Sequence, residues 1–267
     1  MKGNNFVKKA FTLAEVLITL AILGFVASVT LPALMANVQL QELQAQFKRT
    51  FLDLNEFASY FQIEHNETVP IYTARYGGTT FYNEYKKHMM NTANISDTSV
   101  WNMANQGLES PFKYHSLTSS LGSDSSGGIC DASVYMMDGL GRVIFFDDAP
   151  KKGYNGPRIC VDINGVKKPN TWGIDVFSFL FTVDGKVIPE GKSHVSSNHY
   201  NAEDADPNAD PPIGPAWQAQ TTTGAVSCYN HANGLTCAYY AQKNENPKNP
   251  NEEYWRHFIG QKQYLNK

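Results

Sequence analysis

The stretch that decides the fold lies near the N-terminus and reads Lys8-Lys9-Ala10-Phe11-Thr12-Leu13-Ala14-Glu15-Val16-Leu17-Ile18-Thr19-Leu20. A short basic leader runs here into a long apolar segment that holds one carboxylate, Glu15. No other charged residue occurs between Val16 and Gln41. A carboxylate is costly to place in hydrocarbon, so an acid inside a membrane-spanning segment marks a functional site by default. Glu15 therefore separates the interpretations of this chain better than any residue downstream.

An ordinary secretory signal does not fit the apolar segment. Such a signal has an apolar core of about 7–15 residues, followed by a small-residue cleavage site. Here the apolar stretch continues from Phe11 to about Ala36, and Ala33-Leu34-Met35-Ala36 is a poor cleavage site. A plain membrane anchor fits the length, because about 24 helical residues span roughly 36 Å. The anchor alone, however, gives Glu15 no role.

The segment from Lys8 to Leu17 resembles the prepilin-type N-terminal cleavage and methylation motif. That motif is shared by type IV pilins and by the pseudopilins of type II secretion systems. The resemblance implies a leader peptide at residues 1–10, recognised through Lys8 and Lys9, and cleavage between Ala10 and Phe11. It also implies N-methylation of the new Phe11 amine. The family usually has glycine before the cleavage point, whereas this chain has Ala10.

The resemblance also assigns a role to Glu15, whose carboxylate is implied to face the N-terminal amine of a neighbouring subunit during assembly. A buried ammonium and a buried carboxylate neutralise each other only when they are paired. Within one helix Phe11 and Glu15 are also i, i+4 neighbours, so a pair inside the chain is the alternative. The implied partners are other pilin-like subunits, a prepilin peptidase, an inner-membrane assembly platform and a cytoplasmic ATPase.

Composition and charge give only a loose frame for the class of protein. The chain has 267 residues, 18% of them charged, and a formal net charge of −3. The leader carries three lysines and no acid, so its removal takes the charge to −6. A nucleic-acid partner is not expected, because such partners require clustered basic residues. The lysines Lys2, Lys8 and Lys9 predict a single-pass protein of the bacterial inner membrane, with its N-terminus in the cytoplasm and its head outside.

The N-terminal helix is expected to have two parts, a transmembrane segment at residues 11–36 and an amphipathic continuation at residues 37–63. The continuation carries an apolar stripe at Leu40, Leu43, Phe47, Phe51, Leu54, Ala58 and Phe61. This stripe is expected to pack on the chain's own domain, with contacts to the helices of other subunits as the alternative. The resemblance implies that the segment from Gly24 to Pro32 loosens when subunits pack, and a simple proline kink is the alternative.

Residues 64–267 are expected to form an extracytoplasmic globular head. Short helices are expected over Thr79–Met90 and Asn251–Leu265. Strands are expected at Ala132–Met137, Val143–Phe146, Ile159–Ile163, Val176–Val183 and Lys186–Ile188. Asp138-Gly139 and Asp184-Gly185 mark hairpin turns between them. The sequence therefore predicts an α+β, pilin-like fold in which a long N-terminal helix packs on an antiparallel sheet.

All four cysteines lie downstream of the apolar segment, and none of them is in a C-x-x-C pair. An even number of cysteines in an exported chain predicts disulfides. Of the three pairings, Cys130–Cys160 and Cys228–Cys237 are favoured, because each closes a short loop. Reduced, buried cysteines are the alternative. The segment from Cys228 to Tyr240 is expected to form a strand or turn pair.

The segment from Val161 to Phe177 resembles a D-x-N-G…P-N…G-x-D-x-F stretch of some bacterial pilin-like proteins. Its Asn164-Gly165 pair predicts a tight turn, in which Asp162 and Asp175 bind backbone amides. A cation held by Asp162, Asn164 and Asp175 is the alternative, and the turn is favoured.

The acidic segment at residues 202–215 partly matches the pattern of a calcium loop. Its oxygen-bearing side chains alternate at Asp204, Asp206, Asn208 and Asp210. The sixth and twelfth positions are Ala209 and Pro215 in place of glycine and glutamate, so an EF-hand is rejected. A solvated loop is favoured over a looser Ca²⁺ site, and no other metal or cofactor is expected.

The sequence predicts a prepilin-like structural subunit of a type IV pilus or of a type II secretion pseudopilus. The motifs of common hydrolases, metalloproteases and nucleotide-binding enzymes are absent from the sequence, so no enzymatic role is expected. The length favours a minor pilin or a pseudopilin, with a binding loop at residues 202–215. The alternative is an exported binding protein or enzyme that uses residues 11–36 only as an anchor.

Overall fold

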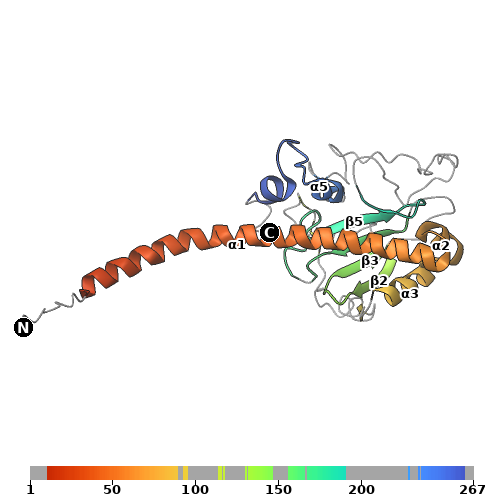
Figure 1. Ribbon diagram of the computed structural model, residues 1–267, viewed down its shortest axis with the longest axis horizontal. Coiled ribbons are helices and arrows are strands. Elements are labelled where there is room, and N and C mark those ends of the chain that lie inside the picture. Colours follow the sequence, from red (N-terminus) through yellow and green to blue (C-terminus); the bar gives the residue numbers. More distant parts are fainter. Residues whose placement is uncertain are drawn as a thin grey trace, which may run out of the picture. The chain divides into compact units, whose positions relative to one another are not determined.

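The computed structural model describes residues 11–89, 93–95, 114, 115, 117, 130, 132–146, 156–165, 167–190, 228, 234 and 236–261. The elements are α1 (Leu13–His65), α2 (Val69–Tyr76), α3 (Gly78–His88), β1 (Ala93–Ile95), β2 (Ala132–Met137), β3 (Val143–Phe146), β4 (Arg158–Asp162), β5 (Val176–Phe181), β6 (Val187–Pro189), α5 (Cys237–Lys243) and the π-helix η1 (Tyr254–Ile259). A long N-terminal helix is thus combined with an antiparallel sheet (Figure 1). The predicted α+β, pilin-like fold class is confirmed.

The chain divides into two compact units, Met1–Gln39 and Leu40–Lys267. Helix α1 contributes to both and runs from Leu13 to His65, with Pro32 inside it. Proline removes one helical hydrogen bond but does not end α1 here. Loosening of the helix between Gly24 and Pro32 during filament packing stays a prediction.

Within the described residues the sheet has six strands in the order β1-β2-β3-β4-β5-β6, and every neighbouring pair is antiparallel. Strands β2 and β3 have the predicted bounds. The bounds of β4, β5 and β6 differ from the predicted ones by at most two residues. The turn after β2 is held by Asp138, whose Oδ1 accepts hydrogen bonds from Leu140 N and Arg142 N, both at 3.0 Å. The predicted meander is therefore present, with β1 added at its edge.

The apolar stripe of α1 packs on one face of this sheet, as the sequence predicts. Six of its seven residues are buried, and Phe51 is partly buried. Phe47 lies at the centre, with its ring centroid 4.7 Å from that of Phe177 and 5.6 Å from that of Phe179, both on β5. Asn55 adds a polar contact, because its Oδ1 accepts a hydrogen bond of 3.1 Å from Val187 N on β6.

The other face of the sheet is covered as well, so β3, β4 and β5 are buried along their whole length. A second core cluster lies there, formed by Tyr114, Cys130, Val143, Phe145, Cys160, Trp172 and Val176. Its disulfide joins Cys130 to Cys160 of β4. The second disulfide joins Cys228 to Cys237. The structure thus has the pairing that the sequence favours.

The expected strand or turn pair between Cys228 and Tyr240 is wrong, because α5 begins at Cys237. Two small residues, Ala238 and Ala241, are buried on this helix and allow it to lie close to its neighbours. Tyr239 N donates a hydrogen bond of 3.1 Å to Glu190 O, just beyond β6. Tertiary contacts therefore override the strand preference of the tyrosines in this segment.

Candidate functional site

The first turn of α1 is closed by Thr12 and Glu15. Thr12 N and Thr12 Oγ1 both donate hydrogen bonds of 2.8 Å to Glu15 Oε2, and Glu15 N donates one of 3.2 Å to Thr12 Oγ1. This reciprocal pattern is a capping box, which satisfies backbone N–H groups that have no partner inside the helix. Glu15 also lies where the helix dipole favours a negative charge. The carboxylate is therefore held in place at the start of α1.

Thr12 is a site residue that the sequence interpretation missed. The T-x-x-E spacing of Thr12 and Glu15 was the pattern that would have revealed it. The leader residues Lys8, Lys9 and Ala10 lie outside the described residues, so their placement stays a prediction. Phe11 is described and is 84% exposed, ahead of the capping box.

The first part of α1 presents an almost wholly apolar surface. Its large exposed apolar side chains are Leu13, Val16, Leu17, Ile18, Leu20, Ile22, Leu23, Phe25, Val26, Val29, Leu31, Leu34, Met35 and Val38. By length and composition α1 is the one helix among the described residues that could cross a membrane. An exposed apolar surface of this size marks a contact with a membrane or with another protein.

The D-x-N-G segment in the head forms the tight turn that was predicted. Asn164 N donates a hydrogen bond of 3.3 Å to Asp162 Oδ1. Asp175 accepts hydrogen bonds from Asn170 N at 2.8 Å and from Thr171 N at 2.6 Å. Gly165 has a φ of +72°, and a Cβ there would lie 2.1 Å from Gly141 O, so only glycine fits. The predicted role of both carboxylates, binding backbone amides, is confirmed.

Asp162 and Asp175 are both fully buried, which disfavours their charged forms. Burial, together with the nearby charge of Asp175, raises the pKa of Asp162 well above its usual range. Burial likewise raises the pKa of Asp175 to about 7, against the lowering effect of its hydrogen bonds to Thr171 and Asn170. Near neutral pH this turn therefore holds a proton that the unfolded chain would have released.

The stability of the head is consequently expected to fall as the pH rises from 5 to 8. The folded state binds more protons than the unfolded state between the usual carboxyl pKa and about 7, so raising the pH removes stability. The variant Asp162→Asn is expected to flatten this dependence, because it removes one carboxyl of the pair. Thermal unfolding at several pH values measures the pH dependence of the wild type and of the variant. Each kcal/mol of change in the free energy of unfolding shifts Tm by roughly 2–4 °C. Parallel pH profiles for the two proteins would contradict the assignment.

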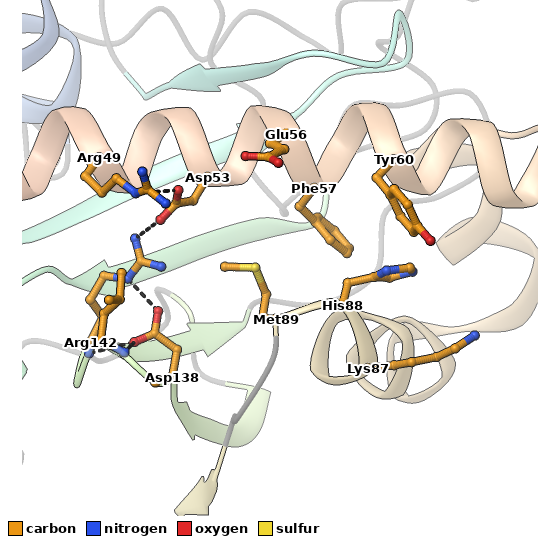
Figure 2. A pocket seen from close by; sticks show the side chains of 12 residues that line it. Arg49, Asp53, Glu56, Phe57, Tyr60, Lys87, His88, Met89, Asp138 and Arg142 are labelled. Atoms are coloured by element: carbon orange, nitrogen blue, oxygen red, sulfur yellow. Dashed lines mark hydrogen bonds and ion pairs between the residues drawn. The ribbon is translucent and has the colours of Figure 1, made fainter.

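The head also has an open pocket of about 700 Å³. It is lined by Arg49, Asp53, Glu56, Phe57, Tyr60, Lys87, His88, Met89, Asp138, Gly139, Leu140 and Arg142. Figure 2 shows Arg142 lying between Asp53 of α1 and Asp138 of the turn after β2. Arg142 Nη1 is 2.9 Å from Asp53 Oδ2, and Arg142 Nε is 2.5 Å from Asp138 Oδ2.

The charged groups of this pocket serve the packing of the head. Arg49 Nε also lies 2.8 Å from Asp53 Oδ1, so Asp53 joins two guanidinium groups. Arg142 Nη1 donates a further hydrogen bond of 3.1 Å to Thr50 Oγ1. This network joins α1 to the turn between β2 and β3, two segments that are distant in the sequence. Paired charges of this kind suit a structural contact.

One comparison with known proteins identifies the N-terminal part of the chain. Residues 6–31 match the prokaryotic N-terminal methylation motif, the signature of type IV pilins and pseudopilins. The match covers the capping box of Thr12 and Glu15, together with most of the exposed apolar part of α1. No curated protein and no solved structure matches the chain.

The motif indicates the precursor of a type IV pilin-like or pseudopilin subunit. It points to a structural subunit, and the apolar helix behind it fits a membrane-anchored pilin. Proteins with this motif are processed by a prepilin peptidase and assemble with other pilin-like subunits.

Proposed function

We propose that this chain is a subunit of a type IV pilus or a type II secretion pseudopilus, cleaved between Ala10 and Phe11 and N-methylated on Phe11. One observation carries the proposal: the methylation motif coincides with the exposed apolar start of α1, which holds a single carboxylate at Glu15. A helix used only as an anchor could close its capping box with an uncharged glutamine, so a carboxylate, which is costly in hydrocarbon, favours a role in charge pairing.

Assembly would depend on two charged groups at the start of the apolar segment. Cleavage leaves a new positive charge on the Phe11 amine, one turn away from Glu15. In the bilayer the two groups of one chain can pair at i, i+4. In a filament, Glu15 would instead pair with the Phe11 amine of a neighbouring subunit, which neutralises both charges and sets the register between helices. A cytoplasmic ATPase and an inner-membrane platform would supply the work of extraction.

The head would stay outside the membrane and decorate the filament. The apolar stripe on the second part of α1 is already covered by the sheet, and large apolar side chains that remain exposed there are Leu52, Tyr60 and Ile63. The leader lysines Lys2, Lys8 and Lys9 favour a cytoplasmic N-terminus. A head of about 200 residues is larger than a compact major subunit needs, so a minor pilin or a pseudopilin is the specific role proposed.

A fractionation experiment tests assembly in the bacterium that encodes the chain. An antibody against the head is used to compare the wild-type strain with a strain that lacks the prepilin peptidase. In the wild type, the mature protein is expected in sheared filaments or in cross-linked subunit ladders. In the mutant, a precursor longer by the ten leader residues should stay in the membrane fraction. The same size and location in both strains would favour a simple anchor.

A further inference from the structure

The end of α1 and one face of α3 bring together two histidines and two glutamates. Glu64 and His65 are the last two residues of α1, and Glu84 and His88 lie one turn apart on α3. One ligand atom from each of the four lies within 4.8 Å of all the others. The two pairs come from segments about 20 residues apart in sequence, and α2 returns the chain between them.

The separations between these atoms suit a four-coordinate metal ion. His88 Nε2 lies 2.7 Å from Glu64 Oε2, and His65 Nε2 lies 3.5 Å from Glu84 Oε2 and 4.0 Å from Glu64 Oε2. Zinc bonds to nitrogen and oxygen are about 2.0–2.2 Å long, so ligand atoms at tetrahedral angles lie roughly 3.3–3.6 Å apart. The three distances lie on either side of that range or within it.

Within the described part of the chain, the imidazole nitrogens that face this cluster are buried and have no partner in hydrogen-bond geometry, although carboxylate oxygens of Glu64 and Glu84 lie nearby. This holds for Nε2 of both His65 and His88, whose side chains are only 18% and 12% exposed. The rings are fixed by aromatic neighbours, with His88 4.5 Å from Tyr60 and His65 4.3 Å from Phe61 between ring centroids. Buried polar atoms normally have a well-aligned partner, so these two nitrogens are available to bind a metal ion.

The cluster already attracts a positive charge in the form of Lys87. Its Nζ lies 3.1 Å from Glu64 Oε1 and 3.5 Å from Glu84 Oε2. The Lys87 side chain is 61% exposed and can turn into solvent. It is therefore a competitor that a metal ion must displace.

We propose that Glu64, His65, Glu84 and His88 form a binding site for a divalent transition-metal ion, with Zn²⁺ as the best-matched ion. Two imidazoles with two carboxylates suit zinc, whereas Ca²⁺ and Mg²⁺ take oxygen ligands. The bound ion would cross-link the end of α1 to α3 and stabilise the head, because a ligand that binds only the folded state raises its stability. The site lies within the head, and the proposal does not depend on filament assembly.

Calorimetric titration with ZnCl₂ tests the site in the full-length, untagged protein, held in detergent and freed of metal with EDTA. The wild type is expected to bind one Zn²⁺ per chain. The variants His65→Gln and His88→Gln are each expected to have an affinity for Zn²⁺ that is lower by more than about tenfold. The matched control is His257→Gln, an exposed histidine on η1, which should bind as the wild type does. Metal content after dialysis gives the stoichiometry independently.

The variant Lys87→Gln distinguishes binding by the four-residue site from incidental binding by a single histidine. Removing the competing ammonium is expected to tighten Zn²⁺ binding at least severalfold and to increase the rise in Tm on adding zinc. This exposed substitution also keeps the test informative if a histidine variant folds poorly. Absence of saturable Zn²⁺ binding in the wild type would overturn the proposal. Unchanged affinity in His65→Gln, His88→Gln and Lys87→Gln would overturn it equally.

Discussion

Replacing Glu15 with alanine is expected to reduce incorporation into filaments to the level of a strain that lacks the subunit. Cleavage between Ala10 and Phe11 should continue, because Lys8, Lys9 and the cleavage residues are unchanged. The physical reason is that the variant leaves the Phe11 amine of a neighbouring subunit without its carboxylate partner in an apolar environment. Quantitative immunoblots of the filament and membrane fractions measure both expectations.

A matched variant distinguishes the charge of Glu15 from its capping role. Glu15→Gln keeps an oxygen that can accept from Thr12, since glutamine also serves in a capping box. It removes the negative charge. If pairing between subunits is what matters, Glu15→Gln should fail to assemble as Glu15→Ala does. Filaments of normal yield from Glu15→Gln would show that the carboxylate acts as a helix cap and would remove the intersubunit pair from the mechanism.

Phe47→Ala is expected to cause the largest loss of stability in the head, on the order of 3–5 kcal/mol. Phe47 is 1% exposed and contacts Phe177, Phe179 and Trp255, so it joins α1, β5 and η1. Truncation would leave a cavity where these three elements meet. Thermal unfolding followed by circular dichroism should show a Tm lower by roughly 10 °C.

Leu52→Ala on the same helix is the control for Phe47→Ala. Leu52 is 63% exposed, and its truncation should change the stability by at most about 0.5 kcal/mol. Both substitutions replace a large apolar residue of α1 by alanine, so they differ chiefly in what surrounds the side chain. Equal Tm values for the two variants would contradict the packing of α1 on the sheet.

The elements that the sequence predicted well are those with a strong local pattern. The helix stripe of α1 repeats every three or four residues, and β2 and β3 flank the Asp138-Gly139 turn. The expected helix at Thr79–Met90 is present as α3, and the one at Asn251–Leu265 as the shorter η1. In each case the residues of one segment carry enough information by themselves.

The elements that were missed depend on contacts between distant segments. Helix α2 has only eight residues, and β1 has three and pairs with β2, nearly 40 residues later in the chain. Helix α5 is stabilised by its contact with Glu190 O and by buried alanines, neither of which its own sequence reveals.

The candidate sites also differ in whether a local sequence pattern reveals them. Glu15 was found because a lone charge in an apolar run is visible in the sequence. The cluster of Glu64, His65, Glu84 and His88 was not found, because its two pairs meet only when α2 folds back between α1 and α3. The acidic segment with Asp204, Asp206, Asn208 and Asp210 lies outside the described residues, so its Ca²⁺ site stays an unfavoured alternative.

The central claim is that the chain is processed as a prepilin, and the intact mass of the mature protein with fragmentation of its N-terminus tests it most directly. The protein is extracted from the membranes of the bacterium that produces it. We expect a chain that begins at Phe11 and carries a methyl group on its α-amine, whereas the peptidase-deficient strain should yield the uncut chain. An intact Met1 in the wild type, or a mature start near Asn37, would contradict the account.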